Sequence, residues 1–180
     1  MKSLQIRKMT YAGLLLALAI LMPVLAGRLP EIGKRMSLMH IPVLLCGFLC
    51  GWPWGLAVGF VAPLLSSAVN GMPAIYPDAV VMAFELATYG CVAGWLYRLL
   101  PRKPWSVYVA LIAAMIAGRI VYGLVYLILT GLGLAEVNGA LTAFIWTRAV
   151  VKPLPGIILH IVLVPALALA LEKAGLSLNK

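Results

Sequence analysis

Residues 105–130 read WSVYVALIAAMIAGRIVYGLVYLILT, and this stretch decides the class of fold. Its single charged residue is Arg119, and the apolar positions on both sides of it run on without regular alternation. A helix that crosses the hydrocarbon core of a bilayer needs about 20 mostly apolar residues. A membrane β-strand would instead alternate apolar and polar side chains. We therefore predict a transmembrane helix over 105–130.

The whole chain shares this apolar character. Of its 180 residues, 64% are hydrophobic and 11% are charged, whereas soluble domains carry about 25% charged residues. Lipid is therefore the solvent for most of the chain, and in lipid a helix satisfies its own backbone polar groups. We predict an all-α integral membrane bundle that forms one domain over 1–180, with no soluble domain.

Six transmembrane helices are expected from the apolar runs. They cover residues 9–26, 38–52, 54–70, 79–99, 105–130 and 139–171. The second and third runs are short, so a re-entrant hairpin is the alternative to two full spans. The sixth run is too long for one straight span, and Pro153 and Pro155 are expected to kink or break it.

The formal net charge of +9 comes mainly from bases at the ends of apolar runs. Positively charged residues favour the cytoplasmic side. With six spans, the segment before residue 9, the loop 98–103 and the tail after 171 share one side, and all three are basic. We therefore predict that both termini are cytoplasmic, although the outer loop 27–37 also carries bases. No basic stripe is interleaved with exposed aromatics, so nucleic acid is not an expected partner.

The sequence indicates neither a metal centre nor a cofactor site. Cys46, Cys50 and Cys91 all lie inside apolar runs, and their odd number argues against a disulfide framework. We interpret them as packing residues, with metal binding by Cys46 and Cys50 as the alternative. The chain has no Walker A motif and no pair of adjacent acids, so we do not expect it to hydrolyse ATP by itself.

Ionisable residues inside the apolar runs mark candidate functional positions, because each costs roughly 2.5–3.5 kcal/mol at the centre of a helix. They are His40, Glu85, Arg119, Arg148, Lys152 and His160. From the rise per residue, Glu85, Arg119 and Arg148 lie roughly 10, 17 and 14 Å below the outer face. Lys152 follows Arg148 by one turn on the same helix face.

Three cations and one carboxylate are thus expected near one another. In a structural interpretation, Glu85 pairs with Arg119 or Arg148, and Lys152 extends towards the cytoplasm. In a functional interpretation, an outward-open polar site takes a ligand with a carboxylate or phosphate, which Arg binds through two hydrogen bonds. The candidate ligand-binding residues are Glu85, Tyr89, Arg119, Tyr122, Arg148, Lys152, His40 and Asn70. The outer loop 70–78 is expected to fold over the ligand.

Small residues recur at helical spacing, which favours close helix contacts over a wide aqueous pore. The repeats are Gly47, Gly51, Gly55 and Gly59, then Gly13 and Ala17, and then Ala110, Ala114 and Gly118.

Four segments between residues 36 and 98 resemble the substrate-binding S components of energy-coupling factor (ECF) vitamin transporters. They are HIPVLLCG at 40–47, GWPWG at 51–55, PLLS at 63–66 with MP at 72–73, and MAFELATYG at 82–90. The number of helices and the predicted sides of the termini also match that family. Its motifs are patterns of residue types rather than fixed signatures.

The resemblance implies a high-affinity binding subunit without enzymatic activity, in the plasma membrane of a prokaryote. It also implies three further partners besides the vitamin, namely a transmembrane coupling subunit and two ATPase subunits. Family members often dock on the coupling subunit through A-x-x-x-A in the first helix, where this chain has Gly13 and Ala17. The loops 27–37 and 70–78 would gate the site. The HIPV segment is similar to pantothenate-type members, and pyridoxine-related or folate-type ligands remain open.

Two other functions compete with ligand binding for transport. The first is a small membrane enzyme for lipid or prenyl substrates, with Glu85, His40 and His160 as acid–base groups. Against it, we predict that His40 lies at the outer end of the second helix and His160 near the cytoplasmic side, too far apart for one site. The second is a scaffold protein in which the buried charges are all structural.

Overall fold

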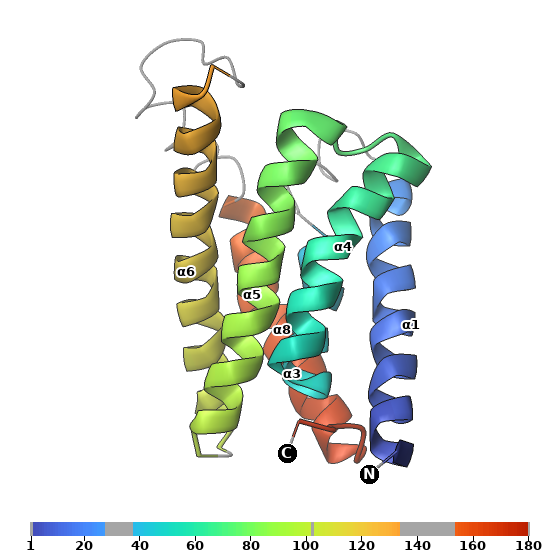
Figure 1. Ribbon diagram of the computed structural model, residues 1–180. Coiled ribbons are helices and arrows are strands. Elements are labelled where there is room, and N and C mark those ends of the chain that lie inside the picture. The colour runs from blue at the N-terminus through green and yellow to red at the C-terminus, as the bar shows by residue number, and fades with distance from the viewer. Residues whose placement is uncertain (1, 28–37, 102, 134–153, 180) are drawn as a thin grey trace.

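The protein is built from helices that run side by side roughly along one axis (Figure 1). The computed structural model describes residues 2–27, 38–101, 103–133 and 154–179, and within these ranges it has no strand. The elements are α1 (Lys2–Gly27), α3 (His40–Cys50), α4 (Trp52–Asn70), the π-helical turn η1 (Ile75–Ala79), α5 (Val80–Leu99), α6 (Pro104–Gly131) and α8 (Leu154–Lys173). The predicted all-α class is confirmed for the described residues.

Five helical segments are long and apolar enough to cross a membrane. They are Leu4–Val24 within α1, α4, the continuous stretch Ile75–Leu99, α6 and α8. The bounds of α4, α5 and α6 lie close to the predicted ones. In contrast, α1 begins at Lys2 rather than at residue 9, and α8 begins at Leu154 rather than at residue 139. Lys, Gln and Arg are good helix formers, so the polar N-terminal segment continues the first helix beyond its apolar run.

Helix α3 is short. It has 11 residues and is therefore about 16 Å long. This length is about half the thickness of the hydrocarbon core of a bilayer, which is about 30 Å. Gly51, with φ of 97°, links it directly to α4. The described part of residues 38–70 is thus a helical hairpin with one short arm. Of the predicted sixth segment, residues 139–153 lie outside the described residues, and α8 begins at Leu154, directly after the first proline of the predicted break.

Three helices of the bundle touch through their backbones. A methyl group added at Gly47 of α3 or Gly55 of α4 would lie 2.5 Å from the carbonyl oxygen of Gly90 on α5. One added at Gly59 would lie 2.7 Å from the backbone nitrogen of Ala87 on α5. The predicted close approach at these glycines is confirmed, and it fixes α3, α4 and α5 as the packed centre of the bundle.

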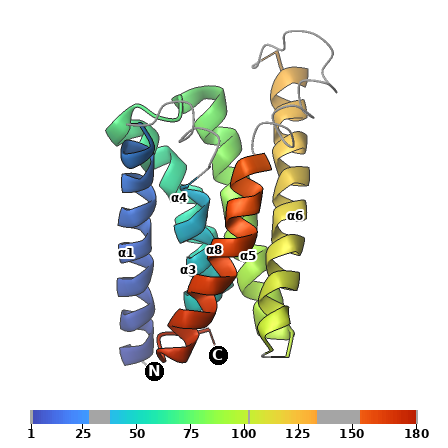
Figure 2. The ribbon, with the colours of Figure 1, turned by 180° about the vertical axis from the view of Figure 1, so that it is seen from behind.

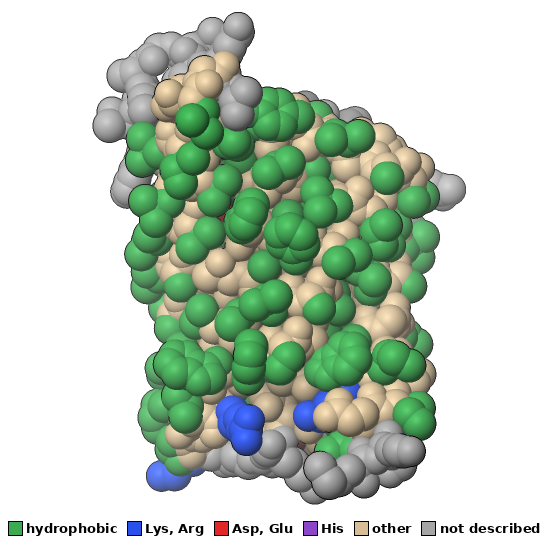
Figure 3. Space-filling view, viewed as in Figure 1, with side chains coloured by type: hydrophobic (Ala, Val, Ile, Leu, Met, Phe, Trp, Pro, Cys, Tyr) green, Lys and Arg blue, Asp and Glu red, His purple; other side chains and the backbone are tan. Residues whose placement is uncertain are grey.

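One end of the bundle collects both termini and the α5–α6 connection (Figures 1 and 2). Basic residues occur there: Arg7 and Lys8 in α1, Arg98 in the last turn of α5, Lys103 before α6 and Lys173 in the last turn of α8. Figure 3 shows Lys and Arg side chains at this end of an otherwise hydrophobic face. We call it the basic end. The positive-inside rule predicts that this end faces the cytoplasm.

The chain's last described residues pack against the basic end. The Leu178 backbone N–H donates to the Leu49 carbonyl oxygen at 2.8 Å. The Asn179 side-chain amide donates to the Gly94 carbonyl oxygen at 3.1 Å, and the residue is buried. The last carbonyls of a helix have no partner within it. The bond from Leu178 therefore caps the C-terminal end of α3.

Candidate functional site

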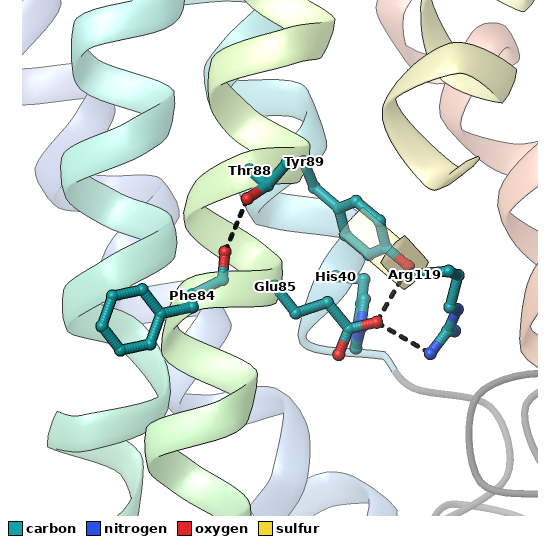
Figure 4. Close-up of polar contacts among 6 residues, drawn as sticks. All are labelled: His40, Phe84, Glu85, Thr88, Tyr89 and Arg119. Carbon is teal, nitrogen blue, oxygen red and sulfur yellow. Dashed lines mark hydrogen bonds and ion pairs between the residues drawn. The ribbon is translucent and has the colours of Figure 1, made fainter. Parts of the chain in front are cut away.

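A polar cluster lies inside the bundle, and its centre is Glu85 on α5 (Figure 4). The Glu85 side chain is 2% exposed. Tyr89 lies one turn further along α5, on the same face, and is also buried. Its hydroxyl donates a hydrogen bond to Glu85 Oε1 at 3.0 Å. A buried carboxylate needs such donors, because burial removes its hydration.

Arg119 of α6 supplies the balancing charge. Its Nη1 lies 2.7 Å from Glu85 Oε1, and its guanidinium carbon lies 6.0 Å from the centre of the Tyr89 ring. Helix rise alone predicts that Glu85 and Arg119 lie in the outer half of the bilayer, and their contact shows that the two side chains lie at the same level of the bundle. It also shows the Glu85–Arg119 pairing of the structural interpretation.

A glycine next to Arg119 shapes the cluster. A methyl group at Gly118 would overlap Cε1 and Cδ1 of the Tyr89 ring. The ring therefore packs directly on the α6 backbone, which brings Arg119 close to α5. From its spacing, Gly118 was predicted to belong to a packing repeat. Its contact with Tyr89 gives it a role in the site that spacing alone did not indicate.

Both histidines of the chain join this cluster. His40, the first residue of α3, has its Nε2 4.0 Å from Glu85 Oε1 and its ring 5.4 Å from the Tyr89 ring. His160 of α8 stacks on His40, with ring centres 5.5 Å apart and an angle of 23° between the planes. Both are buried.

The prediction that the two histidines lie near opposite faces is therefore wrong. It counted the depth of His160 from residue 139, whereas α8 begins at Leu154, so His160 lies only about 9 Å from the start of its helix. His40 begins a half-length helix that starts among the other helices of the bundle. The distance argument against an enzyme thus no longer holds.

Arg119 keeps hydrogen-bonding capacity beyond its ion pair. A guanidinium has five N–H donors. Among the described residues, Nη1 meets Glu85, while Nε is buried without a hydrogen-bond partner. The Arg119 side chain is 17% exposed, more than the Glu85 side chain. The Nε–H is therefore a donor that a ligand could use.

The first turn of α3 adds a second positive feature. Its N-cap residue, Met39, makes no side-chain capping bond. Its Ile41 N–H already donates to the Leu38 carbonyl oxygen at 3.2 Å, and Pro42 has no N–H. The first turn therefore contributes the positive end of the helix dipole rather than a set of free donors. This end of α3 enters the cluster through His40, so it favours negative charge at the same place as Arg119.

The structure places two other predicted ligand-binding residues outside these contacts. The Asn70 amide donates to the Ile20 carbonyl oxygen at 2.8 Å and so connects α4 to α1. Tyr122, one turn beyond Arg119 on α6, is buried and stacks on Tyr126 with ring centres 6.0 Å apart. The remaining two, Arg148 and Lys152, lie outside the described residues.

The predicted docking residues lie on the surface of α1. Gly13 and Ala17 are both exposed, and a methyl group at Gly13 would meet no atom within 4 Å. The predicted gating loop follows α4, where the Ser66 and Ser67 hydroxyls donate to the carbonyl oxygens of Met72 at 2.8 Å and Pro73 at 2.6 Å. These bonds hold the beginning of that loop against α4. Residues 28–37 of the other predicted gating loop lie outside the described residues.

A protein-family model matches most of the sequence. The family model described as ECF transporter, substrate-specific component, matches residues 7–168. The match includes all five residues of the polar cluster, which are His40, Glu85, Tyr89, Arg119 and His160. No curated protein and no solved structure matches the sequence.

Proposed function

Because the chain belongs to the family of substrate-specific components of ECF transporters, we propose that it binds a water-soluble vitamin or vitamin precursor with an acidic group for import. The family makes the chain a multi-pass membrane subunit of a transporter that selects its substrate. The polar cluster is the proposed binding site. Arg119, Glu85, Tyr89 and His40 are the proposed contacts, with Tyr122, Arg148, Lys152 and Asn70 as further candidates.

The observation that carries this proposal is the unused donor capacity of Arg119. A ligand carboxylate would accept from the guanidinium N–H groups that Glu85 does not occupy. The first turn of α3 would add partial positive charge beside it. Pantothenate is the first candidate because it carries a carboxylate, and pyridoxine-related and folate-type compounds follow.

We further propose that the ligand-loaded subunit docks on a transmembrane coupling subunit that is driven by two ATPase subunits. The exposed small residues Gly13 and Ala17 would let another helix approach α1 closely. The membrane would be the plasma membrane of a prokaryote, with the basic end in the cytoplasm. In this assembly the chain contributes binding, and the ATPases contribute the energy.

The test begins with the protein purified in detergent. Mass spectrometry identifies any small molecule that co-purifies, and calorimetry then measures the binding of pantothenate, folate and pyridoxal phosphate. Arg119→Gln should weaken binding of an acidic ligand at least about tenfold, the value of one charged hydrogen bond. Arg98→Gln at the basic end is the matched control, and it should bind like the wild type.

Loss of one partner also leaves Glu85 buried and unpaired, which costs about 3–5 kcal/mol of stability. The double variant Glu85→Gln with Arg119→Gln removes both charges and separates a folding defect from a binding defect. A double variant that folds and binds as tightly as the wild type would contradict the proposed site.

The enzyme alternative is supported by one observation, the meeting of Glu85, His40 and His160. The family assignment favours binding over catalysis, since its members are defined as substrate-specific subunits of transporters. Chemical turnover of a lipid or prenyl substrate by the purified chain alone would favour the enzyme.

A further inference from the structure

The two histidines that the chain contains come from helices about 120 residues apart in sequence, yet their rings stack at 5.5 Å. Histidine is the side chain whose ordinary charge change falls between about pH 5 and 8. Both histidines of the chain thus lie inside the cluster, beside an ion pair.

Among the residues that the structure describes, the cluster has no net charge when the imidazoles are neutral. Glu85 contributes one negative charge and Arg119 one positive charge, and they meet at 2.7 Å. An acidic ligand that binds Arg119 brings a second negative charge into the bundle. Two anions would then share one guanidinium in a medium where unpaired charge is costly.

A proton on the histidine pair would restore the balance. His40 is the nearer of the two to the carboxylate, with Nε2 at 4.0 Å from Glu85 Oε1. We propose that binding of an acidic ligand is coupled to the uptake of one proton from water by the His40–His160 pair. This inference rests on the proposed function, and it adds a pH dependence to the same site.

One proton, and not two, follows from the stacking. Two imidazolium rings with centres 5.5 Å apart would repel each other in a low-dielectric interior. Among the described residues, Glu85 and Tyr89 of α5 face His40, and Arg119 of α6 binds Glu85. Helix α4 has no ionisable residue, and α1 has its charged residues in its first two turns.

The stacking also argues against a metal ion as the bridge between the histidines. An imidazole binds a metal through a lone pair in the plane of its ring. The two rings are stacked only 23° from parallel, so their in-plane lone pairs do not point at a common position between the rings. Among the described residues, no group of three His, Cys, Asp or Glu side chains is arranged to hold a metal.

Calorimetry in two buffers with different heats of ionisation counts the protons that are exchanged on binding. The probes are pantothenate, folate and pyridoxal phosphate, each titrated between about pH 5.5 and 8. For a probe that binds, we expect uptake approaching one proton at the alkaline end, where affinity should fall by about tenfold per pH unit. His40→Gln and His160→Gln should each reduce the uptake and flatten this dependence.

Thr88→Val is the control. Thr88 precedes Tyr89 on α5, and its hydroxyl donates to the Phe84 carbonyl oxygen at 2.8 Å, away from the cluster (Figure 4). This variant should keep the proton uptake of the wild type. If the histidine variants do not fold, ¹⁵N-histidine spectra of the wild-type protein provide the same test. One of the two signals should move to the imidazolium form when the ligand is added.

Two results would overturn the proposed proton uptake. The first leaves the proposed function intact, and the second also refutes it. Tight binding without proton uptake would mean that an existing cation, such as Arg148 or Lys152, balances the ligand's charge, and the proposed function would stand. Binding of none of the three acidic probes across the pH range would refute the acidic-ligand function together with the coupling.

Discussion

At the scale of single residues, Glu85 sets the energetics of the site. Its carboxylate is buried in a helix that crosses the membrane, and three groups converge on one of its oxygens: the Tyr89 hydroxyl, the Arg119 guanidinium and the His40 ring. Such a group is stable only with its partners in place. Residues that hold the partners in position therefore matter as much as the partners themselves.

Gly118 is such a residue, and Gly118→Ala tests it. The added methyl group would overlap the Tyr89 ring, so the ring must move and its bond to Glu85 must lengthen or break. We expect a loss of about 1–3 kcal/mol in stability from overpacking and weaker ligand binding. Thermal unfolding in detergent and calorimetry measure the two effects.

Gly131→Ala is the matched control, since it lies on the same helix and its methyl group would meet no atom within 4 Å. It should be neutral or slightly stabilising, because Ala favours helix over Gly. Equal stability and equal affinity for the two variants would show that Tyr89 does not pack on Gly118.

At the scale of helices, α5 is the helix on which α3, α4 and α6 all pack. Glycines bring α3, α4 and α5 into backbone contact, whereas α6 meets α5 at the cluster through side chains. Close approach through glycine is the usual way in which membrane helices gain packing, because lipid provides no hydrophobic drive for helix association.

Gly59→Ala tests the backbone contact between α4 and α5. The methyl group would meet the α5 backbone, 2.5 Å from the Leu86 carbonyl carbon, and backbone moves less readily than a side chain. We expect a stability loss at or above the upper end of the 1–3 kcal/mol range that is typical of overpacking. Gly13→Ala in α1, where the space is open, should unfold at the wild-type temperature. A Gly59→Ala protein as stable as Gly13→Ala would contradict backbone contact between α4 and α5.

The helices also show what the sequence predicts and where it fails. Continuous apolar runs predicted α4, α5 and α6 to within two residues at each end, because a helix must be long enough to cross the lipid bilayer. Counting along α5 and α6 then brought Glu85 and Arg119 together. The same counting failed for His160, because it started from residue 139, whereas α8 begins at Leu154. The contact of Gly118 with Tyr89 could not be predicted from the sequence either, since spacing does not reveal which helix a glycine faces.

At the scale of the whole molecule, the distribution of charge determines how the protein lies in the membrane. Bases at the starts of α1 and α6 and at the ends of α5 and α8 share one end of the bundle. Each base near an anionic membrane surface contributes about 1 kcal/mol, and the cytoplasmic leaflet is the anionic one. The opposite end carries exposed apolar residues of the loop before α5, among them Ile75 at 65% exposure.

Single-cysteine labelling in intact cells tests the predicted orientation. Lys103→Cys at the basic end and Ile75→Cys at the opposite end are introduced into a chain whose Cys46, Cys50 and Cys91 are replaced by alanine. A membrane-impermeant maleimide should label Ile75→Cys from outside, and it should label Lys103→Cys only after the cells are opened. The parent chain without cysteine controls for background. The reverse pattern would place the basic end outside, and the termini with it. The α3 N-terminus and Arg119 would then have to receive their ligand from the cytoplasm, which is incompatible with import through this site.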